Sequence, residues 1–517
     1  MSMGTAEARY HQLEQTRQSY LDRARDCSEL TIPSLIPQDV HNETSDLYTP
    51  FQGIGARGVN NLASKLSIAL MPPNSPFFRF MVEPYTLKEM AQDEAARTSI
   101  EQQLGEYERA VMSEIETSGD RVAMHEALKH LIVGGNVLLH VGADKTRVIH
   151  LDSYVVSRAP SGDVLEIVLV EHVSPNALDK ATAANISGKL EGDEKTVEVY
   201  THIERKNEFF NVYQEVKGTV VSGSKGRYKK DSVPFLPLRF SRIDGEDYGR
   251  GFVEELLGDL RSLEGLSQAI VEGAAAAAKV LFMVNPNGTT RMRTIAQAEN
   301  TAIIEGNRND VSVLQMDKFN DFRVAYQAMA GIEERLSQQF MLQSSVQRNG
   351  ERVTAEEIRY LAGELEDTLS GIYSILSQEF QLPYVNRKID VLTKAKKLPK
   401  LPDNVVKPTI VTGMEALGRG HDLRKLDMFI QGMTQALGPE VLQQYVNLQD
   451  YIKRRATALG IETEGLIKSQ EQIAQEQQQA MQMQMMQQAA PGVAQEGAKQ
   501  LGNSYVESQR QQGGGEG

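Results

Sequence analysis

The sequence predicts a mainly helical α+β protein, in which one antiparallel β segment lies between helical regions. Two patterns predict this class, and the chain length bounds the size of the core. Apolar residues recur every three to four positions before about residue 130 and again after about residue 250. Short β-branched and aromatic runs between turn-forming residues fill the segment from about 136 to 244. The chain of 517 residues is also long enough to bury an ample core, over about two to four domains, without disulfides or metal ions.

The N-terminal region predicts three helices. Val59, Leu62, Leu66 and Leu70 fall on one helix face, and Met71-Pro72-Pro73 ends that helix because proline cannot continue the hydrogen-bond ladder. Two further helices are expected over about 93–116 and 122–133, the latter broken by two glycines at 134–135. Strands are expected over 164–170, 196–203 and 209–213, with turns at 160–163 and 217–218.

Two long helices are expected over 251–279 and 319–341, with a compact module between them. The alanine run at 274–278 has narrow side chains that allow close helix–helix approach. The polar segment 343–353 predicts a loop. Thr354 and Glu357 form a capping box that opens a third long helix of about 28 residues, expected to stop near Pro383. Helices return over 421–468, and the glutamine-rich residues from 471 are expected to be mobile.

Composition excludes several classes of protein. The 55 basic against 69 acidic residues give a formal net charge of −14, which disfavours nucleic-acid binding over the whole surface. The single Cys27 excludes a disulfide framework and a cysteine-based zinc site. The polar first 14 residues do not form a signal peptide, and no apolar run reaches the roughly 18 residues of a membrane span. We therefore expect a soluble protein, made inside the cell, that does not enter a membrane.

Several motifs suggest catalysis, but each lacks a required part. The G-x-G-x-x-G match at 53–58 has no strand before it, so it predicts only a flexible start of a helix. The pair Gly188-Lys189 has leucine after it and no glycine at 183, so there is no P-loop. The carboxylates at 254, 255 and 259 and at 364, 366 and 367 are typical of solvated helix faces. We expect no enzyme.

One histidine pair suggests a metal site. His125 and His130 are five residues apart, so on a helix their side chains diverge by about 140° instead of sharing a face, as a metal-binding pair four residues apart would. Both are expected to be ordinary helix-surface histidines. We expect neither a metal site nor a cofactor.

The residues flanking the long helices resemble a known family. The run QRNGERVTAEEIRY at 347–360 is the most specific, with further similarity at 31–35, 55–66, 248–250, 259–264 and 363–369. Together they resemble the portal, or head-to-tail connector, proteins of short-tailed, autographivirus-type (podovirus) bacteriophages. The similarity extends from about residue 5 to 470, and the glutamine-rich tail is not covered in detail.

The resemblance implies the portal fold with its named regions. These are a wing at 1–248, stem helices at 249–279 and 319–341, a clip at 280–318, a tunnel loop at 342–353, a long wing helix and return to the wing at 354–437 and a crown at 438–470. The glutamine-rich tail at 471–517 follows, and its composition predicts that it is mobile.

The resemblance also implies a function without a cofactor or reaction. Portal rings, usually of twelve subunits, sit at one capsid vertex, and double-stranded DNA passes through them during packaging and ejection. The implied partners are the terminase large subunit, a tail adaptor, the major capsid and scaffolding proteins, and internal core proteins. The implied location is the virion, after synthesis in the host cytoplasm. The alternative is a non-portal head–tail adaptor or scaffolding ring protein.

Site residues follow from this resemblance. In the tunnel loop, Arg348 and Arg352, helped by Gln347 and Asn349, are expected to contact DNA phosphates, and Gly350 to let the loop flex. The alternative is that the two arginines pair with Glu351 or Glu356 of the same or the next subunit.

Two further sets are expected outside the loop. Ala274 and Ala276 are expected to pack between stem helices. Lys279 ends the first stem helix, where a cation suits either the helix dipole or the channel. Arg291 and Arg293 are expected to dock terminase or adaptor, with solvated surface charges as the alternative.

Overall fold

The computed structural model describes residues 5–38, 46–73, 76–82, 94–178, 196–277, 281–314, 319–342, 365, 371–399, 406–410, 428–436, 438 and 451–452. The chain divides into two compact units, Met1–Ala416 and Leu417–Gly517. The second unit is described mainly at 428–436, which is helical. None of the described helices has the length and apolarity needed to cross a membrane.

The first described helices of the chain are α1 (Ala6–Glu29), α2 (Ile54–Leu70), α4 (Glu94–Thr117) and α5 (Asp120–Gly134). The last three contribute much of the main core, to which α1 adds Cys27. The expected face of α2 is buried (Val59, Leu62, Leu66 and Leu70), and the helix ends where the two prolines were expected to stop it. The predictions for α2, α4 and α5 are therefore confirmed to within about two residues. Strand β1 (Phe78–Val82) pairs antiparallel with β13 (Val406–Ile410).

The β segment is antiparallel, as the sequence predicted, and it folds into two sheets. The smaller has the order β10 (Phe235–Arg239), β2 (Asn136–Val141) and β3 (Thr146–Ile149). The six-stranded sheet has the order β4 (Tyr154–Arg158), β5 (Val164–Val173), β6 (Val197–Lys206), β7 (Phe209–Val216) and β8 (Thr219–Val220), with β9 (Gly226–Lys229) also on β7. Short 3-10 turns η1 (Leu151–Ser153), η2 (Pro175–Ala177) and η4 (Lys230–Ser232) connect them.

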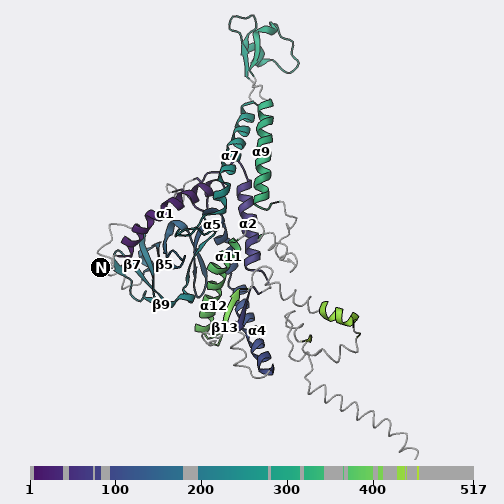
Figure 1. Ribbon diagram of the computed structural model, residues 1–517. Helices are drawn as coiled ribbons and strands as arrows, with labels where there is room; N and C mark the ends of the chain where they lie inside the picture. The colour runs from purple at the N-terminus through teal and green to yellow at the C-terminus, as the bar shows by residue number, and fades with distance from the viewer. Residues whose placement is uncertain are drawn as a thin grey trace, which may run out of the picture. The chain divides into compact units, whose positions relative to one another are not determined.

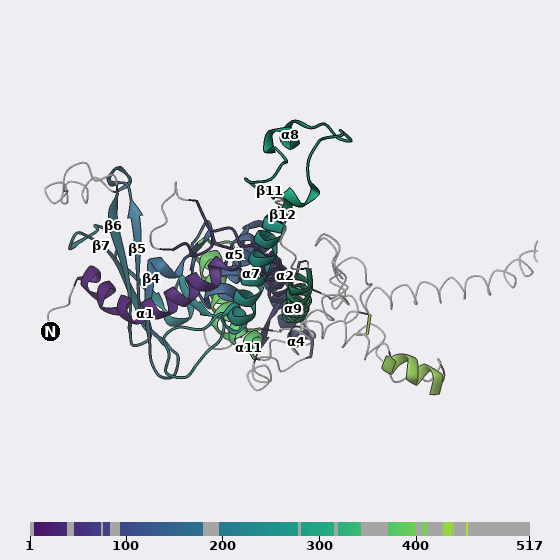
Figure 2. The same ribbon diagram turned by 90° about the horizontal axis from the view of Figure 1, so that it is seen from above.

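Alternating residues of the larger sheet enter different hydrophobic clusters. Ile167 and Leu169 of β5 join one cluster with Leu21 of α1, whereas Val168 joins another with Tyr10 of the same helix. This alternation is the period-two pattern of a strand with apolar residues on both faces. Helix α1 lies along the sheet, as Figure 2 shows.

Two long helices pack beside each other. They are α7 (Phe252–Ala277) and α9 (Phe319–Gln339), whose bounds match the two predicted long helices (Figure 1). Between them in sequence lies a small module. Strands β11 (Leu281–Val284) and β12 (Val311–Leu314) pair antiparallel. The chain that connects them contains α8 (Met292–Gln297) and η5 (Arg308–Asp310).

The third long helix differs from its prediction. Gly371 has a left-handed φ of +90°, and helix α11 (Ile372–Leu376) begins directly after it. A π-helical segment, η7 (Ser377–Gln381), then joins α11 to α12 (Leu382–Lys394). The expected stop near Pro383 is wrong, because the helical backbone continues through it: the Leu382 N–H donates to the Ser377 carbonyl oxygen in the π-helical pattern, and α12 runs on to Lys394.

Candidate functional site

The segment that leads into α7 is fixed to both sheets by buried polar contacts. Asn136, at the start of β2, donates from Nδ2 to the carbonyl oxygen of Gly249 and accepts from its N–H at Oδ1, both at 2.7 Å. Tyr248 is buried, and its hydroxyl accepts from the N–H of Val156 at 3.0 Å. A Cβ at Gly251 would lie 2.4 Å from the carbonyl oxygen of Val133. Close backbone packing therefore explains the glycines that precede this helix.

The end of α9 is held by α2. The Asn61 amide donates to the carbonyl oxygens of Phe340 and Met341 at 2.9 and 3.1 Å, and the Lys65 ammonium donates to Met341 at 3.1 Å. Phe340 is fully buried, and its ring lies where a side chain on Gly58 would be. Amide and ammonium donors thus satisfy carbonyls that a helix end leaves unpaired. They fix the chain just before the loop predicted at 343–353.

A single carboxylate attaches the segment before α2 to α7. Glu264 accepts from the Tyr48 hydroxyl at 2.6 Å, from the Phe51 N–H at 2.8 Å and from the Gln52 N–H at 3.2 Å. Its hydrogen bond to Tyr48 raises the pKa of that phenol to about 12. Glu264 therefore positions an irregular segment against the middle of the long helix.

The paired helices leave apolar side chains uncovered. Leu260, Leu263 and Leu336 are buried in the main core, near the helix ends that meet it. In contrast, Val271 of α7 and Val324 and Tyr326 of α9 are each more than half exposed. Ala274 and Ala276, which sequence analysis singled out, are also exposed in the single chain. The far halves of α7 and α9 thus present narrow and apolar surface that this chain alone does not bury.

The module between the helices is organised by Asp310. Its Oδ2 accepts from the N–H and hydroxyl of Thr289 at 2.8 and 3.1 Å, and from both groups of Thr290 at 3.1 Å. These bonds, the Thr290 N–H first among them, hold the pKa of the Asp310 carboxyl below its usual value. A Cβ at Gly288 would lie 2.4 Å from this carboxyl carbon. Glycine is therefore needed for the close approach.

Charged and apolar side chains share the surface of this module. Arg291 precedes α8 and Arg293 lies within it, and both are exposed. Four large apolar side chains are about half exposed or more: Phe282, Met283, Met292 and Ile303. Exposed apolar groups gathered on one small module are typical of a protein–protein contact.

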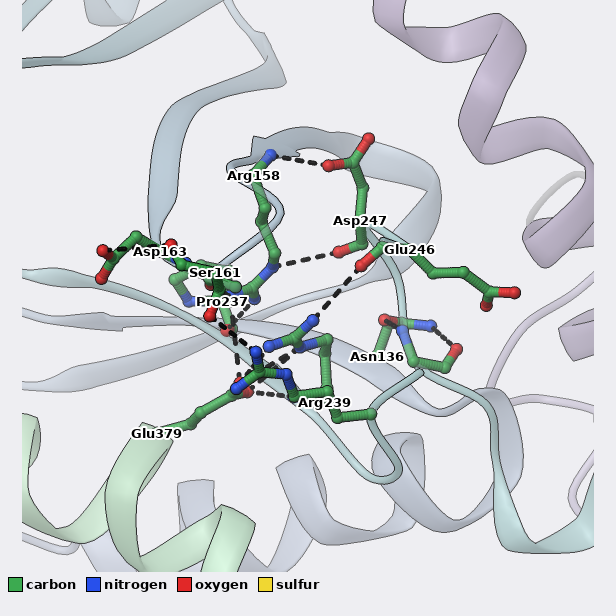
Figure 3. Close-up of polar contacts among 12 residues, drawn as sticks. Asn136, Arg158, Ser161, Asp163, Pro237, Arg239, Glu246, Asp247 and Glu379 are labelled. Carbon is green, nitrogen blue, oxygen red and sulfur yellow. Dashed lines mark hydrogen bonds and ion pairs between the residues drawn. The ribbon is translucent and has the colours of Figure 1, made fainter. Parts of the chain in front are cut away.

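A buried ionic network joins the sheets to the third long helix (Figure 3). Arg239, at the end of β10, is 1% exposed and donates from Nε to Glu379 Oε1 at 3.1 Å. Arg158 of β4 lies 4.0 Å from the same carboxylate and donates to the carbonyl oxygens of Pro237 and Asp247. Burial lowers the pKa of Arg158 to about 10, with Glu379 opposing that shift. Glu379 belongs to η7, so the π-helical segment sits where the helix meets both arginines.

The other predicted site residues lie outside the described residues. These are Gln347, Arg348, Asn349, Gly350 and Arg352 of the expected loop, and Lys279. Sequence reasoning missed the roles of Asn136, Glu379 and Asp310. Their partners are far away in sequence, and only an isolated polar residue within an apolar run, as at Asn136, gave any signal.

One group among the described residues has the donors for a metal ion. Ligand atoms of Glu126, His130 and His150 all lie within 4.8 Å of one another. The expectation that His130 is a surface residue is wrong, because it is 1% exposed. It faces inward because α5 is covered by core on more than one side.

Comparison with known sequences gives consistent matches along almost the whole chain. A family model described as "Bacteriophage head to tail connecting protein" matches residues 3–468. The portal protein of Escherichia phage T7 is 44% identical over 494 residues, covering 93% of this chain and 91% of that protein. The portal protein of Enterobacteria phage T3 is 43% identical, over 93% of this chain and 90% of that one. The portal protein of Enterobacteria phage SP6 is 30% identical, over 95% and 96%.

Solved structures match more distantly. One is the neck of an empty gene transfer agent (GTA) particle, computed with C6 symmetry, with 10% identity and a TM-score of 0.34 over 79% of this chain and 90% of that chain. A TM-score this low carries no argument, so the assignment rests on the sequence relatives. With 44% identity to a portal protein and a family model that spans residues 3–468, the chain belongs to the bacteriophage head-to-tail connecting proteins, the portal proteins of short-tailed phages.

Proposed function

We propose that twelve copies of this chain close into a ring at one capsid vertex, through which double-stranded DNA is packaged and later ejected. The family assignment carries this proposal, since 93% of the chain aligns with the portal protein of phage T7. As a member of this family the chain is a virion component at the head–tail connection. It acts by holding and guiding DNA, and a partner terminase supplies the ATP hydrolysis.

The surface of α7 and α9 supports ring assembly. Identical subunits with a head-to-tail interface close into a ring when the rotation between neighbours permits. Such an interface needs surface that a single chain leaves uncovered, and Val271, Ala276 and Tyr326 provide it. Small alanine side chains allow neighbouring helices to approach closely. These helices are the two stem helices in our proposal, and the β11–β12 module is the clip.

The mass of the native particle tests the proposal directly. Twelve copies of 57.4 kDa give about 690 kDa, and electron micrographs of the full chain should show rings with an axial opening. A protein that stays monomeric under assembly conditions, or forms particles without an opening, would refute it.

A substitution within α7 tests which surface closes the ring. Ala276→Phe should reduce the yield of assembled rings, because the bulky phenylalanine side chain prevents the helices of neighbouring subunits from approaching closely. The matched control is Ala8→Phe, at an exposed alanine of α1, which should assemble normally. Normal rings from the Ala276 variant would contradict the packing role.

The DNA contacts of the proposed channel come from the tunnel loop. Arg348 and Arg352 would touch backbone phosphates, helped by Gln347 and Asn349, while Gly350 allows the loop to move. Each neutralised phosphate adds to the affinity for DNA, and twelve copies multiply that affinity. A channel that must let DNA pass therefore needs few such contacts, and the otherwise acidic chain keeps them few. The alternative pairs the arginines with Glu351 or Glu356.

Charge reversal distinguishes the two alternatives. The double variant Arg348→Glu and Arg352→Glu should lower the amount of DNA retained in assembled particles. A matched control is Lys145→Glu with Lys225→Glu, at exposed lysines of the β region, which makes the same charge change elsewhere. Equal DNA retention in both double variants would favour the ion-pair alternative.

The clip is the proposed docking surface for the terminase large subunit and later for the tail adaptor. Exposed Arg291 and Arg293 beside Met292 support this assignment. Replacing both arginines with glutamate should weaken capture of purified terminase by preformed rings. Unchanged capture would mean that the two arginines are solvated surface charges. Capsid, scaffolding and internal core proteins are further proposed partners.

A further inference from the structure

The strongest unassigned feature is a cluster of metal-ligating side chains where α5 meets the turn after β3. Glu126 and His130 are four residues apart on α5, one turn from each other. His150 comes from the residue just before η1. One donor atom from each of the three side chains lies within 4.8 Å of the other two. An ion at the centre of such a triangle is within about 2.8 Å of each donor. Small side-chain rotations would bring each donor atom to the roughly 2.0–2.2 Å from the ion that a metal–ligand bond requires.

The buried histidine has unused bonding capacity. His130 is 1% exposed, and its Nδ1 atom has no hydrogen-bond partner among the described residues. Its ring centroid lies 4.4 Å from that of His150, with a 44° angle between the ring planes. Buried polar atoms are normally paired, so an unpaired one needs an explanation. A metal ion shared with the neighbouring imidazole would supply the missing partner.

The third side chain of the cluster supplies a carboxylate. Glu126 is exposed and brings a carboxylate to the open side of the pair.

We propose that Glu126, His130 and His150 form a binding site for a divalent transition-metal ion of the zinc class. Two imidazoles and one carboxylate are the donors that Zn²⁺ accepts, with water in a fourth position. Imidazole ligands disfavour Mg²⁺ and Ca²⁺, which prefer oxygen donors. The sequence argument against a metal concerned the pair His125 and His130. The cluster instead uses Glu126 and a histidine 20 positions beyond His130 in the chain.

The ion would have a structural role. Leu128 and Leu131 of α5 belong to the main helical core, while Leu151 and Tyr154, just after His150, belong to the core beneath the sheet. A ligand set drawn from both sides joins the two cores. An ion that binds the folded chain alone also stabilises it by mass action.

The test is a metal titration of the purified full-length chain after removal of metal with a chelator. Co²⁺ reports imidazole ligation through its visible absorption, and Zn²⁺ should displace it. We expect one Co²⁺ per chain and a higher thermal unfolding midpoint with Zn²⁺. Glu126→Gln, at an exposed position, and His150→Gln should each weaken binding by about tenfold or more.

Two histidine variants provide matched controls. His125→Gln alters the same helix outside the cluster, and His172→Gln removes an exposed histidine of β5. Both should bind Co²⁺ as the unmodified chain does. Equal titration curves for the unmodified chain, Glu126→Gln and His150→Gln would overturn the proposal. Absence of any binding would overturn it too. Ring assembly is scored separately, so failure of this site leaves the proposed function untouched.

Discussion

The ammonium nitrogen of Lys388 lies 2.5 Å from the Asp120 carboxylate, and both side chains are almost fully buried. Tyr384 also donates its hydroxyl to this carboxylate at 2.6 Å. Burial alone would raise the pKa of Asp120, but the bonds from Lys388 and Tyr384 outweigh it and leave the pKa below its usual value. Helix α12 is thereby fastened to the first turn of α5.

Removing the cation of this pair should be strongly destabilising. In Lys388→Met the carboxylate stays buried without its partner charge, and we expect a loss of about 3–5 kcal/mol in the free energy of unfolding. Denaturant unfolding followed by circular dichroism measures this. Lys394→Met is the control, since Lys394 is exposed and pairs with Asp390 at the surface, where a pair contributes about 0–1 kcal/mol. Similar losses in the two variants would contradict the buried role.

The Glu166 carboxylate makes a pH-dependent link between α1 and the larger sheet. It accepts from Arg9 Nε at 2.8 Å and lies 2.6 Å from His202 Nε2. Burial opposes ionisation, but the bonds to His202 and Arg9 lower the pKa of Glu166 to about 2. An unfolded glutamate has a pKa of about 4.3. The stabilisation is therefore present above about pH 4.3 and is lost as the pH falls towards 2.

Glu166→Gln should flatten the acid limb of the stability curve. The difference in pKa corresponds to about 3 kcal/mol at neutral pH. Unfolding midpoints measured between pH 6 and pH 2.5 should converge for the variant and the unmodified chain at the acid end. Glu204→Gln, on the more exposed pair with Lys206, is the control and should leave the pH dependence unchanged. Parallel curves for Glu166→Gln and the unmodified chain would rule out this link.

Gly58 tests the packing of α2 against the end of α9. A Cβ at this position would lie 2.3 Å from the Phe340 ring, so Gly58→Ala should displace the ring and cost about 1–3 kcal/mol. Gly105→Ala is the control, because the position on α4 is open. There alanine should stabilise the helix by up to about 1 kcal/mol. Thermal unfolding of the two variants should therefore shift in opposite directions, and shifts of the same sign would contradict the clash.

Local sequence patterns predicted the helices and strands, but they did not predict the contacts between residues far apart in the sequence. The spacing of Val59 to Leu70 fixed a helix and its buried face, because amphipathic periodicity is a local property. Pro383 misled the prediction, because proline normally disrupts a helix interior, whereas here it directly follows a π-helical segment and the helix continues. Asp120 and Lys388 are 268 positions apart, and each alone is typical of a solvated helix face. Their pairing depends on how α5 and α12 pack, which one sequence does not reveal.

The same limit applies to the candidate site. Ala274 and Ala276 were singled out because of the alanine run and are exposed on α7 in the single chain, and their packing role stays a prediction. His130 was placed on a surface because only its nearest histidine was considered. His150 lies close to His130 because β3, which directly precedes His150, packs against α5.

Asp310 should control the order of the small module between α7 and α9. Its carboxylate holds Thr289 and Thr290 by four hydrogen bonds, so Asp310→Ala leaves two backbone N–H groups without their acceptor. The segment that carries Arg291 and Arg293, at the start of α8, should then open more often. Since a protease cleaves opened segments, trypsin should cut after these arginines severalfold faster in the variant.

The control for this experiment is Asp144→Ala, in an exposed turn between β2 and β3, which should leave the rate of cleavage at 291 and 293 unchanged. Cleavage sites are read by mass spectrometry on the unassembled chain, so that ring contacts do not shield the module. Equal rates for Asp310→Ala and the unmodified chain would mean that the β11–β12 pairing alone orders this segment. A faster rate confined to these arginines identifies Asp310 as the residue that orders this part of the module.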